Sequence, residues 1–466
     1  MVTARTPQGD VAGNAANTAA GTHVGGAPGA AAGPESGAAV RPALGANARW
    51  IQLLLGFIVM MTISSPQYVW TLFTGDFMKT TGARLSDVQW TITLLIVLQT
   101  WLAPAQGYLV ERYGPRRLIG LGAVLSGAGW IAASRVGDLI GLYASYGLLC
   151  GLGTGIVYVG IVGLMVRWFP ERRGFATGIV AAGYGFGAIF STFPIDAMMK
   201  SSGYQTTLLV FGAIFAVVGL LAALGLRTPG AGEATPGAAV AAAPTVRSVA
   251  PAEMLKTPVF WLMFLMFSMM STGGLMVITQ FKSFAQSFGI DGKTMITLGG
   301  ATLAAIPAAL TFDRVTNGLT RPFFGWVSDR IGRENTMAIA FILEGCAIGL
   351  LLAFRSDPFL LVLLSGLVFF GWGEIFSLFP STLTDTFGTG YASTNYGFLY
   401  MAQGVGSILG APVAAMIFER TGSWLPVFYT IIGMDIATGL LALFALKGMR
   451  RRLLAAPAAR GAVPVR

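Results

Sequence analysis

The chain has 466 residues, of which 54% are hydrophobic and only 11% are charged, and its formal net charge is +10. Soluble domains carry about 25% charged residues, so this composition excludes a disordered protein, a disulfide-rich secreted scaffold and an ordinary soluble enzyme. A polytopic helical membrane protein remains. The single histidine, His23, lies in a low-complexity stretch, and Cys150 and Cys346 stand in apolar runs without metal-ligand spacing. We therefore expect no metal site, no histidine-based catalysis and two cysteines that act as small buried hydrophobes.

Apolar segments of about 20 residues follow one another along the chain, each long enough to cross about 30 Å of hydrocarbon as a helix. A stretch rich in Ala and Pro, 227–257, divides them six and six. We predict an all-α membrane protein with twelve transmembrane helices in two six-helix bundles. The predicted parts are a disordered tail (1–47), the N-terminal bundle (48–226), a cytoplasmic central loop (227–257), the C-terminal bundle (258–447) and a basic cytoplasmic tail (448–466). The predicted helices are 50–73, 87–110, 117–134, 139–166, 174–197, 205–226, 258–281, 304–327, 336–354, 359–384, 395–418 and 425–446.

The distribution of basic residues orients these helices. With the N-terminus placed in the cytoplasm, most of the 30 Lys and Arg residues fall on the cytoplasmic side, as the positive-inside rule requires. We therefore predict an integral protein of the cell (inner) membrane with both termini in the cytoplasm. This orientation explains the surplus of positive charge, so we expect no nucleic-acid partner.

One short motif occurs twice. The pattern G-x-x-x-[DE]-R-x-G stands at 107–114 and again at 325–332, each time after the second helix of a six-helix half. Gly permits close helix approach and a tight turn, and the acids and arginines can pair and bridge helix ends. We predict a cytoplasmic gate between two halves that rock against each other. Its residues are Glu111, Arg112, Asp329 and Arg330.

Ionisable residues inside the predicted helices are candidates for function, because a charge at a helix centre costs about 2.5–3.5 kcal/mol or more. Arg314 and Arg321 are seven residues apart, so they share a helix face and bracket the midplane, where transporters bind substrates. A substrate carboxylate would match a guanidinium in two-point geometry. The alternative is that these arginines pair with acidic side chains of the protein itself. Asp313 is adjacent to Arg314 in sequence but points about 100° away from it around the helix. Glu374 is therefore the better partner for Arg314. If Glu374 does not pair with Arg314, it is a candidate proton carrier.

Several segments resemble a known family. The repeated loop motif and the six-plus-six arrangement look like the major facilitator superfamily, and further segments resemble its oxalate:formate antiporter family. The resemblance runs from about residue 50 to residue 450. The segments that carry it are Gln-Tyr-Val-Trp-Thr-Leu (67–72), Arg-Trp-Phe-Pro-Glu-Arg-Arg-Gly (167–174) with Ala-Ala-Gly-Tyr-Gly (181–185), Asn-Gly-Leu-Thr-Arg-Pro-Phe (317–323), Leu-Phe-Pro-Ser-Thr (378–382) and Asn-Tyr-Gly-Phe (395–398).

The resemblance implies the major facilitator fold and a secondary transporter of small organic anions that works by alternating access, without enzymatic activity or a cofactor. In the family's N-G-x-x-R-P pattern the arginine binds substrate, and here it is Arg321. The family places a lysine eight residues after the asparagine of its N-Y-G-F segment, where this chain has Gln403. The remaining implied substrate-binding residues, which supply aromatic walls, hydroxyls and an amide, are Gln67, Tyr68, Tyr158, Tyr184, Trp372, Phe376 and Tyr400.

Three functions stay open at this point. The first is antiport of oxalate- and formate-type carboxylates. Gln403 removes a cation and Phe376 lacks a hydroxyl, so either Arg314 supplies the second cation for a dianion or the substrate is a monocarboxylate. With Glu374 as a proton carrier, a proton-coupled monocarboxylate symporter is the second. The third is a carboxylate sensor that does not transport. The expected partners are a small carboxylate and the lipid bilayer, with the protein as a monomer. We assign no specific role to two further acidic residues in the predicted membrane helices, Glu344 and Asp435.

Overall fold

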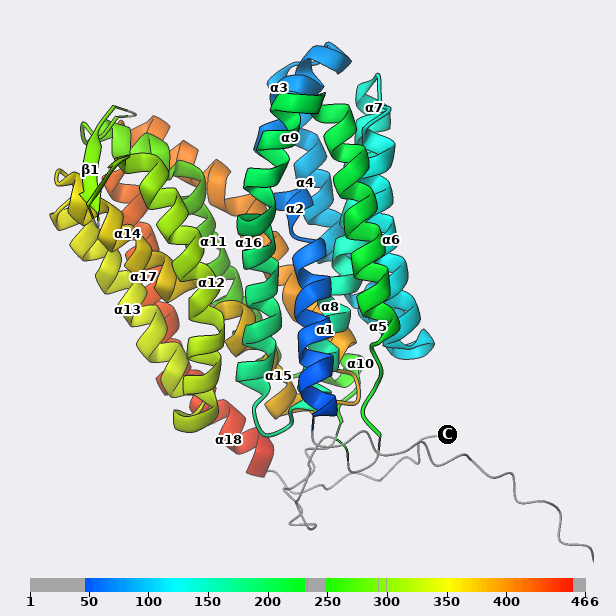
Figure 1. Cartoon of the computed structure of the whole chain (residues 1–466). Helices are drawn as coiled ribbons and strands as arrows, with labels where there is room; N and C mark the ends of the chain where they lie inside the picture. Colours follow the sequence, from blue (N-terminus) through cyan, green and yellow to red (C-terminus); the bar gives the residue numbers. More distant parts are fainter. Residues whose placement is uncertain (1–46, 231–232, 234–247, 292, 299, 456–466) are drawn as a thin grey trace, which may run out of the picture. The chain divides into compact units, whose positions relative to one another are not determined.

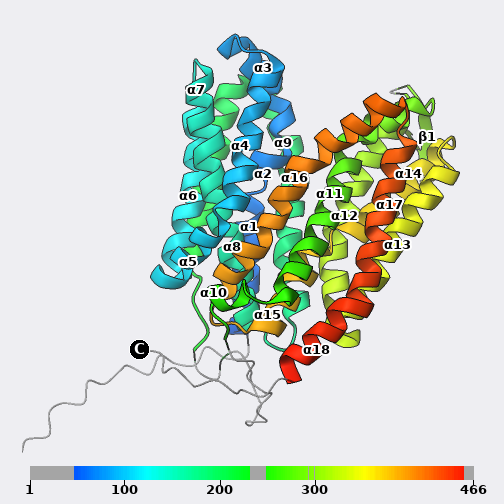
Figure 2. The same cartoon turned by 180° about the vertical axis from the view of Figure 1, so that it is seen from behind.

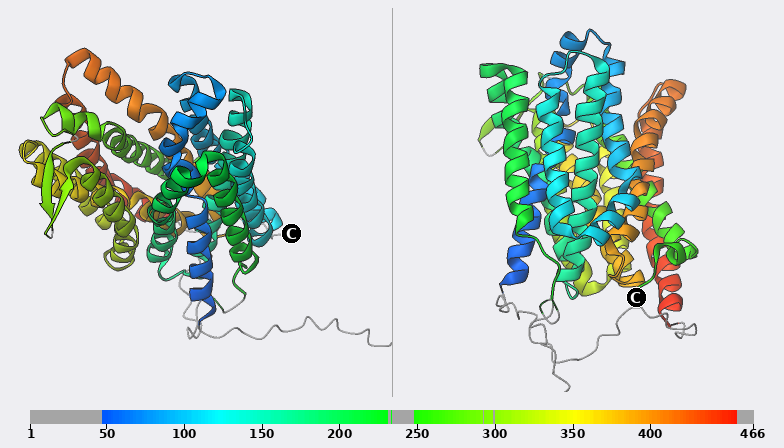
Figure 3. Two further views of the ribbon diagram at one scale, coloured as in Figure 1. Left: turned by 45° about the horizontal axis from the view of Figure 1, so that its top comes forward. Right: turned by 90° about the vertical axis from the view of Figure 1, so that its right-hand side faces the viewer.

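The computed structural model describes residues 47–230, 233, 248–291, 293–298 and 300–455. The predicted disordered tail (apart from residue 47), His23, most of the central loop and the last part of the basic tail lie outside these residues. Within them the chain is almost entirely helical, and the long helices run side by side (Figure 1, Figure 3).

Residues 48–224, called the N half below, form helices at the first six predicted segments. Breaks near Ser64 and Leu102 divide the first two segments, and Gly203 separates the two arms of α9, which are the fifth and sixth predicted helices. The elements are α1 (Ala48–Thr62), α2 (Ser65–Tyr68), α3 (Trp70–Thr81), α4 (Leu85–Trp101), α5 (Ala103–Tyr113), α6 (Pro115–Ala133), α7 (Leu139–Leu142), the π-helical η1 (Tyr143–Leu149), α8 (Cys150–Trp168) and α9 (Arg173–Leu224).

Residues 251–455, called the C half, occupy the other six predicted segments and continue into the basic tail. Its elements are α10 (Pro251–Met254), α11 (Pro258–Ser287), β1 (Met295–Leu298), β2 (Ala301–Ala304), α12 (Ala305–Ile331), α13 (Arg333–Ala353), α14 (Pro358–Trp372), α15 (Ile375–Phe387), α16 (Ala392–Thr421), α17 (Leu425–Leu440), the π-helical η2 (Leu441–Leu446) and α18 (Lys447–Ala455).

The β1–β2 hairpin was not predicted. Its strands are antiparallel and pair Met295 with Ala304 and Leu298 with Ala301. Four-residue strands of this kind leave only a short alternating pattern in the sequence, which is easily missed beside long apolar helices. Cys346 also differs from expectation, since it is exposed, whereas Cys150 is buried.

Eight helices in the described residues are long and apolar enough to cross a membrane, or nine if the bent pair α4–α5 is one span. This criterion treats the two arms of α9 as one helix. It also leaves out α6 and α12. Helices nevertheless stand at every segment that the hydropathy of the sequence predicts.

The two halves pack on each other mainly through α9 against α12 and α5 against α16. We call the end of the molecule that holds Glu111 and Asp329 the motif end, and the end that holds β1 and β2 the hairpin end (Figure 1, Figure 2). At the motif end the backbones of the two halves touch. A side chain on Gly107 would overlap the Ser393 carbonyl oxygen, and one on Gly325 would overlap the Gly174 carbonyl oxygen. Small residues are therefore required at these crossings.

Candidate functional site

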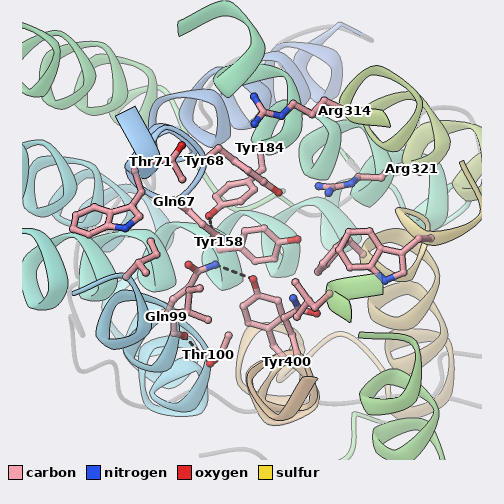
Figure 4. A pocket seen from close by; sticks show the side chains of 17 residues that line it. Gln67, Tyr68, Thr71, Gln99, Thr100, Tyr158, Tyr184, Arg314, Arg321 and Tyr400 are labelled. Carbon is pink, nitrogen blue, oxygen red and sulfur yellow. Dashed lines mark hydrogen bonds between the residues drawn. The ribbon is translucent and has the colours of Figure 1, made fainter. Parts of the chain in front are cut away.

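A cavity of about 340 Å³ lies between the two halves (Figure 4). All nine residues predicted to bind substrate line it, and so does Arg314. The N half supplies Gln67, Tyr68, Tyr158 and Tyr184, and the C half supplies Arg321, Trp372, Phe376, Tyr400 and Gln403. The sequence reasoning missed the other lining residues, which are Trp70, Thr71, Ile92, Ile96, Gln99, Thr100 and Leu275.

Arg321 forms the charged part of the cavity wall. Its side chain is almost fully buried, and it donates hydrogen bonds to the carbonyl oxygen of Ala181 at 2.5 Å and to Oδ1 of Asn317 at 2.9 Å. Its guanidinium carbon lies 4.7 Å from the centre of the Phe376 ring. Both acceptors are neutral and Nε has no hydrogen-bond partner in the described chain. The positive charge is therefore positioned by the protein but not paired with a carboxylate.

Aromatic rings make up most of the remaining wall. Tyr158 from α8 stacks on Tyr400 from α16, with centroids 4.8 Å apart and planes 9° apart. Tyr184 meets Tyr158 edge-on at 5.3 Å, and Phe376 meets Trp372 edge-on at 6.0 Å. Such walls keep water away and strengthen the field of the nearby guanidinium. One stacked ring comes from each half, so the stack crosses the boundary along which the halves meet.

Amide side chains orient the tyrosine hydroxyls. The hydroxyl of Tyr184 donates to Oε1 of Gln67 at 2.6 Å, and Nε2 of Gln99 donates to the hydroxyl of Tyr400 at 2.9 Å. Gln403, on α16 like Tyr400, also lines the cavity, and its Oε1 is buried and without a partner in the described residues. The site thus contains one buried cation, neutral amides and hydroxyl groups. Such a site suits a small anion whose charge contacts the cation and whose other polar atoms form hydrogen bonds with the amides and hydroxyl groups.

The proposed pairing of Arg314 with Glu374 is wrong for this structure. Both oxygens of Glu374 are buried without a hydrogen-bond partner among the described residues, and Arg314 lines the cavity instead. Glu374 stands at the break between α14 and α15. The physical reason is burial, because the carboxyl of Glu374 is fully buried at this break, whereas Arg314 is an exposed residue that lines the cavity. Asp313 is also buried in the C half, and it does not line the cavity.

At the motif end, the acid of each motif copy contacts the first turn of a helix in the opposite half. Glu111 accepts hydrogen bonds from the backbone N–H groups of Ser393 at 2.7 Å and Thr394 at 3.2 Å, at the start of α16. Asp329 accepts from the N–H groups of Gly174 at 3.0 Å and Phe175 at 2.9 Å, at the start of α9. Carboxylates are stabilised at helix N-termini, so both acids hold the halves together.

Ion pairs strengthen the same contacts. Asp329 pairs with Arg333 at 2.6 Å. Asp385 bridges the halves, because it pairs with Arg173 of the N half at 2.6 Å and with Arg333 of the C half at 2.7 Å. Glu111 pairs with Arg167 at 3.3 Å. The last glycine of each motif copy, Gly114 or Gly332, turns the chain with a φ of 88° or 91°, a conformation that other residues rarely adopt.

The motif arginines do not take the predicted part in these contacts. Arg112 donates to the hydroxyl of Tyr108, and the guanidinium of Arg330 lies 3.8 Å from the centre of the Trp326 ring. Neither forms an ion pair within the part of the chain that the structure describes. Since both follow the acid directly, they point away from it around the helix. Arg167, Arg173 and Arg333, which the sequence reasoning did not select for the gate, pair with the acids instead.

Comparisons with known proteins define the class. The sequence model of the Major Facilitator Superfamily matches residues 52–317 and 302–464. A solved structure of the proton:xylose symporter XylE bound to 6-bromo-6-deoxy-D-glucose has the same fold, with a TM-score of 0.62 at 12% identity over 85% of this chain and 95% of that one. The chain is therefore a membrane transporter of the major facilitator class and not an enzyme.

The comparisons also narrow the family. The oxalate:formate antiporter of Oxalobacter formigenes is 34% identical over 405 residues, which are 86% of this chain and 93% of the relative. The chain belongs to the oxalate:formate antiporter-like family of the superfamily, as the resemblance of its motifs indicated. Monocarboxylate transporter 13 of Bos taurus is 22% identical over 382 residues, 80% of this chain and 84% of the relative.

Proposed function

We propose that this protein carries small organic carboxylates across the membrane by alternating access, in exchange of the oxalate and formate type. The observation that supports this most directly is Arg321, a buried guanidinium at the wall of a cavity between the halves, held by two neutral acceptors. A buried charge without a counter-charge is costly. A carboxylate entering the cavity offsets that cost and can use the fork geometry of the guanidinium.

The orientation belongs to the same proposal. Basic side chains that include Arg116, Arg172 and Arg451 stand at or beyond helix ends on the motif side, and the positive-inside rule places such an end in the cytoplasm. In this structure the motif end is closed by the contacts of Glu111, Asp329 and Asp385. We therefore assign the structure to a state closed on the cytoplasmic side of the inner membrane.

Exchange is tested by counterflow. Proteoliposomes that contain the purified protein and a load of unlabelled oxalate or formate are expected to accumulate labelled oxalate without any proton gradient, because an exchanger needs only substrate on both sides. Protein-free vesicles give the background. Exchange that strictly requires a proton gradient would contradict this reading. Measurable binding without any accumulation would favour a sensor.

A second candidate, proton-coupled transport of monocarboxylates, is favoured by Gln403. A dianion such as oxalate is most naturally held by two cations, and this wall offers a neutral amide where the family has lysine. The mammalian relative named as a monocarboxylate transporter is compatible with a single-carboxylate substrate.

Gln403→Lys is expected to raise the affinity for oxalate about tenfold or more relative to formate and pyruvate. The added ammonium would supply a second charge-assisted hydrogen bond, and such bonds contribute about 1.5–3 kcal/mol. Competition of unlabelled carboxylates against labelled oxalate measures the ratio. Gln403→Met, which keeps length without charge, is the control. Equal ratios in all three proteins would show that Gln403 does not face the substrate.

A further inference from the structure

The turn between α15 and α16, residues 388–391, is one of the places where the two halves meet at the motif end. Arg167 of the N half donates hydrogen bonds to the carbonyl oxygens of Thr389 at 3.2 Å and of Gly390 at 3.1 Å. Glu111, which pairs with Arg167, binds the start of α16 just beyond the turn. Arg167 can form both of its bonds only when the turn presents the two carbonyl oxygens side by side.

The last residues of the central loop bind the same turn. Residues 248–255, called the strap below, precede α11 and include the short helix α10, which contacts α16 (Figure 2). The backbone N–H of Val249 donates to the carbonyl oxygen of Phe387 at 2.8 Å, and Oγ of Ser248 accepts from the N–H of Gly390 at 2.9 Å. Gly390 therefore bonds to the strap through its N–H and to the N half through its C=O.

Asn395 provides a third bond to the strap. Its Nδ2 donates to the carbonyl oxygen of Val249 at 3.0 Å, and its side chain is buried in the first turn of α16. Asn395 is the first residue of the Asn-Tyr-Gly-Phe segment, which carries part of the family resemblance, but it does not line the substrate cavity. Its contacts place its role at the motif end.

The strap is itself fixed to the C half. Met254 is fully buried, and its carbonyl oxygen accepts from the hydroxyl of Thr257 at 2.7 Å. Trp261 on α11 donates through Nε1 to the carbonyl oxygen of Leu255 at 2.8 Å. These bonds and those to the turn all lie within the C half. When the halves part at the motif end, the bonds of Arg167 to the turn must break, but the bonds of the strap can remain.

A turn without the strap would have to be ordered each time the halves meet. Ordering a flexible segment costs conformational entropy, and a segment that is already ordered forms its contacts without that cost. We propose that the strap, anchored by Asn395, holds the turn in the shape that Arg167 binds and so stabilises the state closed at the motif end. Asn395 and Ser248 are then positioning residues of the transport cycle that do not touch the substrate. This inference rests on the proposed alternating access and adds an element that sets the balance of its states.

Labelling of a cysteine in the cavity, Thr71→Cys in protein that carries Cys346→Ser, tests the strap. In oriented vesicles, Asn395→Ala is expected to make a membrane-impermeant maleimide react about two- to tenfold faster from the motif side and more slowly from the hairpin side. The net contribution of one hydrogen bond corresponds to about this factor. Ser248→Ala, at an exposed position, is expected to shift both rates in the same direction by a smaller factor.

Asn335→Ala is the matched control. Asn335 is an asparagine of the C half that bonds to Ile331 and Lys447 of the same half, and its loss is expected to leave both labelling rates unchanged. Wild-type rates in Asn395→Ala and Ser248→Ala proteins that are monodisperse in detergent would overturn the proposal. If Asn395→Ala does not fold, wild-type rates in Ser248→Ala alone would do so.

A double substitution separates positioning from a general loss of packing. In Arg167→Ala protein the turn has lost the guanidinium that the strap serves, so adding Asn395→Ala is expected to change the labelling rates by less than half of its factor in the wild-type background. Equal factors in the two backgrounds would overturn the positioning role. The expected labelling shifts in a protein that exchanges no carboxylate would overturn the proposed substrate and leave the strap standing.

Discussion

Arg321→Ala is expected to lower carboxylate transport by a hundredfold or more. The guanidinium is the one buried cation that we find in the described wall of the cavity, and two charge-assisted hydrogen bonds to a carboxylate contribute about 3–6 kcal/mol. The transport rate of Arg321→Lys is expected to lie between the rates of the wild-type protein and of Arg321→Ala. It keeps the charge but loses the fork, so it cannot hold Ala181, Asn317 and a substrate at once. Initial rates of counterflow at several oxalate concentrations measure both variants.

The bonds from Arg321 also tie α12 to α9, so a loss of transport must be separated from a loss of folding. The fraction of monodisperse protein and its melting temperature in detergent serve that purpose for each variant. Arg420→Ala is the matched control, because Arg420 is exposed at the end of α16 and has no ion pair among the described residues. Transport at the wild-type rate by folded Arg321→Ala would refute the assignment of Arg321 as the substrate ligand.

Asp329→Asn is expected to open the motif end. The substitution removes the ion pair with Arg333 and weakens the acceptors for the N–H groups of Gly174 and Phe175. Truncating one partner of a buried charge pair costs about 2–5 kcal/mol, and about 2 kcal/mol shifts a two-state equilibrium roughly thirtyfold. The state open at the motif end should therefore gain population, and net transport should slow because the closed state is no longer readily reached.

Cysteine labelling measures this shift. Thr71→Cys lines the cavity, and Cys346→Ser removes the exposed native thiol. In the Asp329→Asn protein a membrane-impermeant maleimide should react more slowly from the hairpin side and faster from the motif side. Glu334→Gln is the control, because Glu334 pairs with Arg450 at the same end but within the C half. Equal effects of the two substitutions would mean that the contact between the halves does not set the equilibrium.

Most of the fold could be predicted because a bilayer imposes a minimum length on each apolar segment. Helix breaks are harder to predict. Gln99 and Thr100 line the cavity because α4 ends at Trp101, just before Pro104, and the next helix leaves at an angle of 53°. An apolar pattern that is continuous in sequence does not show where such a bend turns a polar residue inward.

The site residues were predicted mainly through the resemblance to a family, since periodicity alone cannot tell a packing aromatic from one that lines a cavity. What sequence reasoning missed are pairings between distant segments. The sequence shows Glu344 and Asp435 as isolated acids that are costly in a membrane, but only the packing of α13 on α17 brings them together. Likewise, Asp385 and Arg173 are 212 positions apart, and nothing local indicates that they pair.

The contacts at the motif end have the geometry of a twofold dimer. In each half the motif acid stands near the end of the second helix and binds the start of the fifth helix of the other half. Glu111 of the N half binds the start of α16, and Asp329 of the C half binds the start of α9. Such reciprocal contacts are what two copies of one subunit form around a twofold axis. A single six-helix chain with one copy of the motif could therefore associate with a second copy of itself through the same pair of contacts. Duplication and fusion of that chain would yield the present arrangement without any new interface.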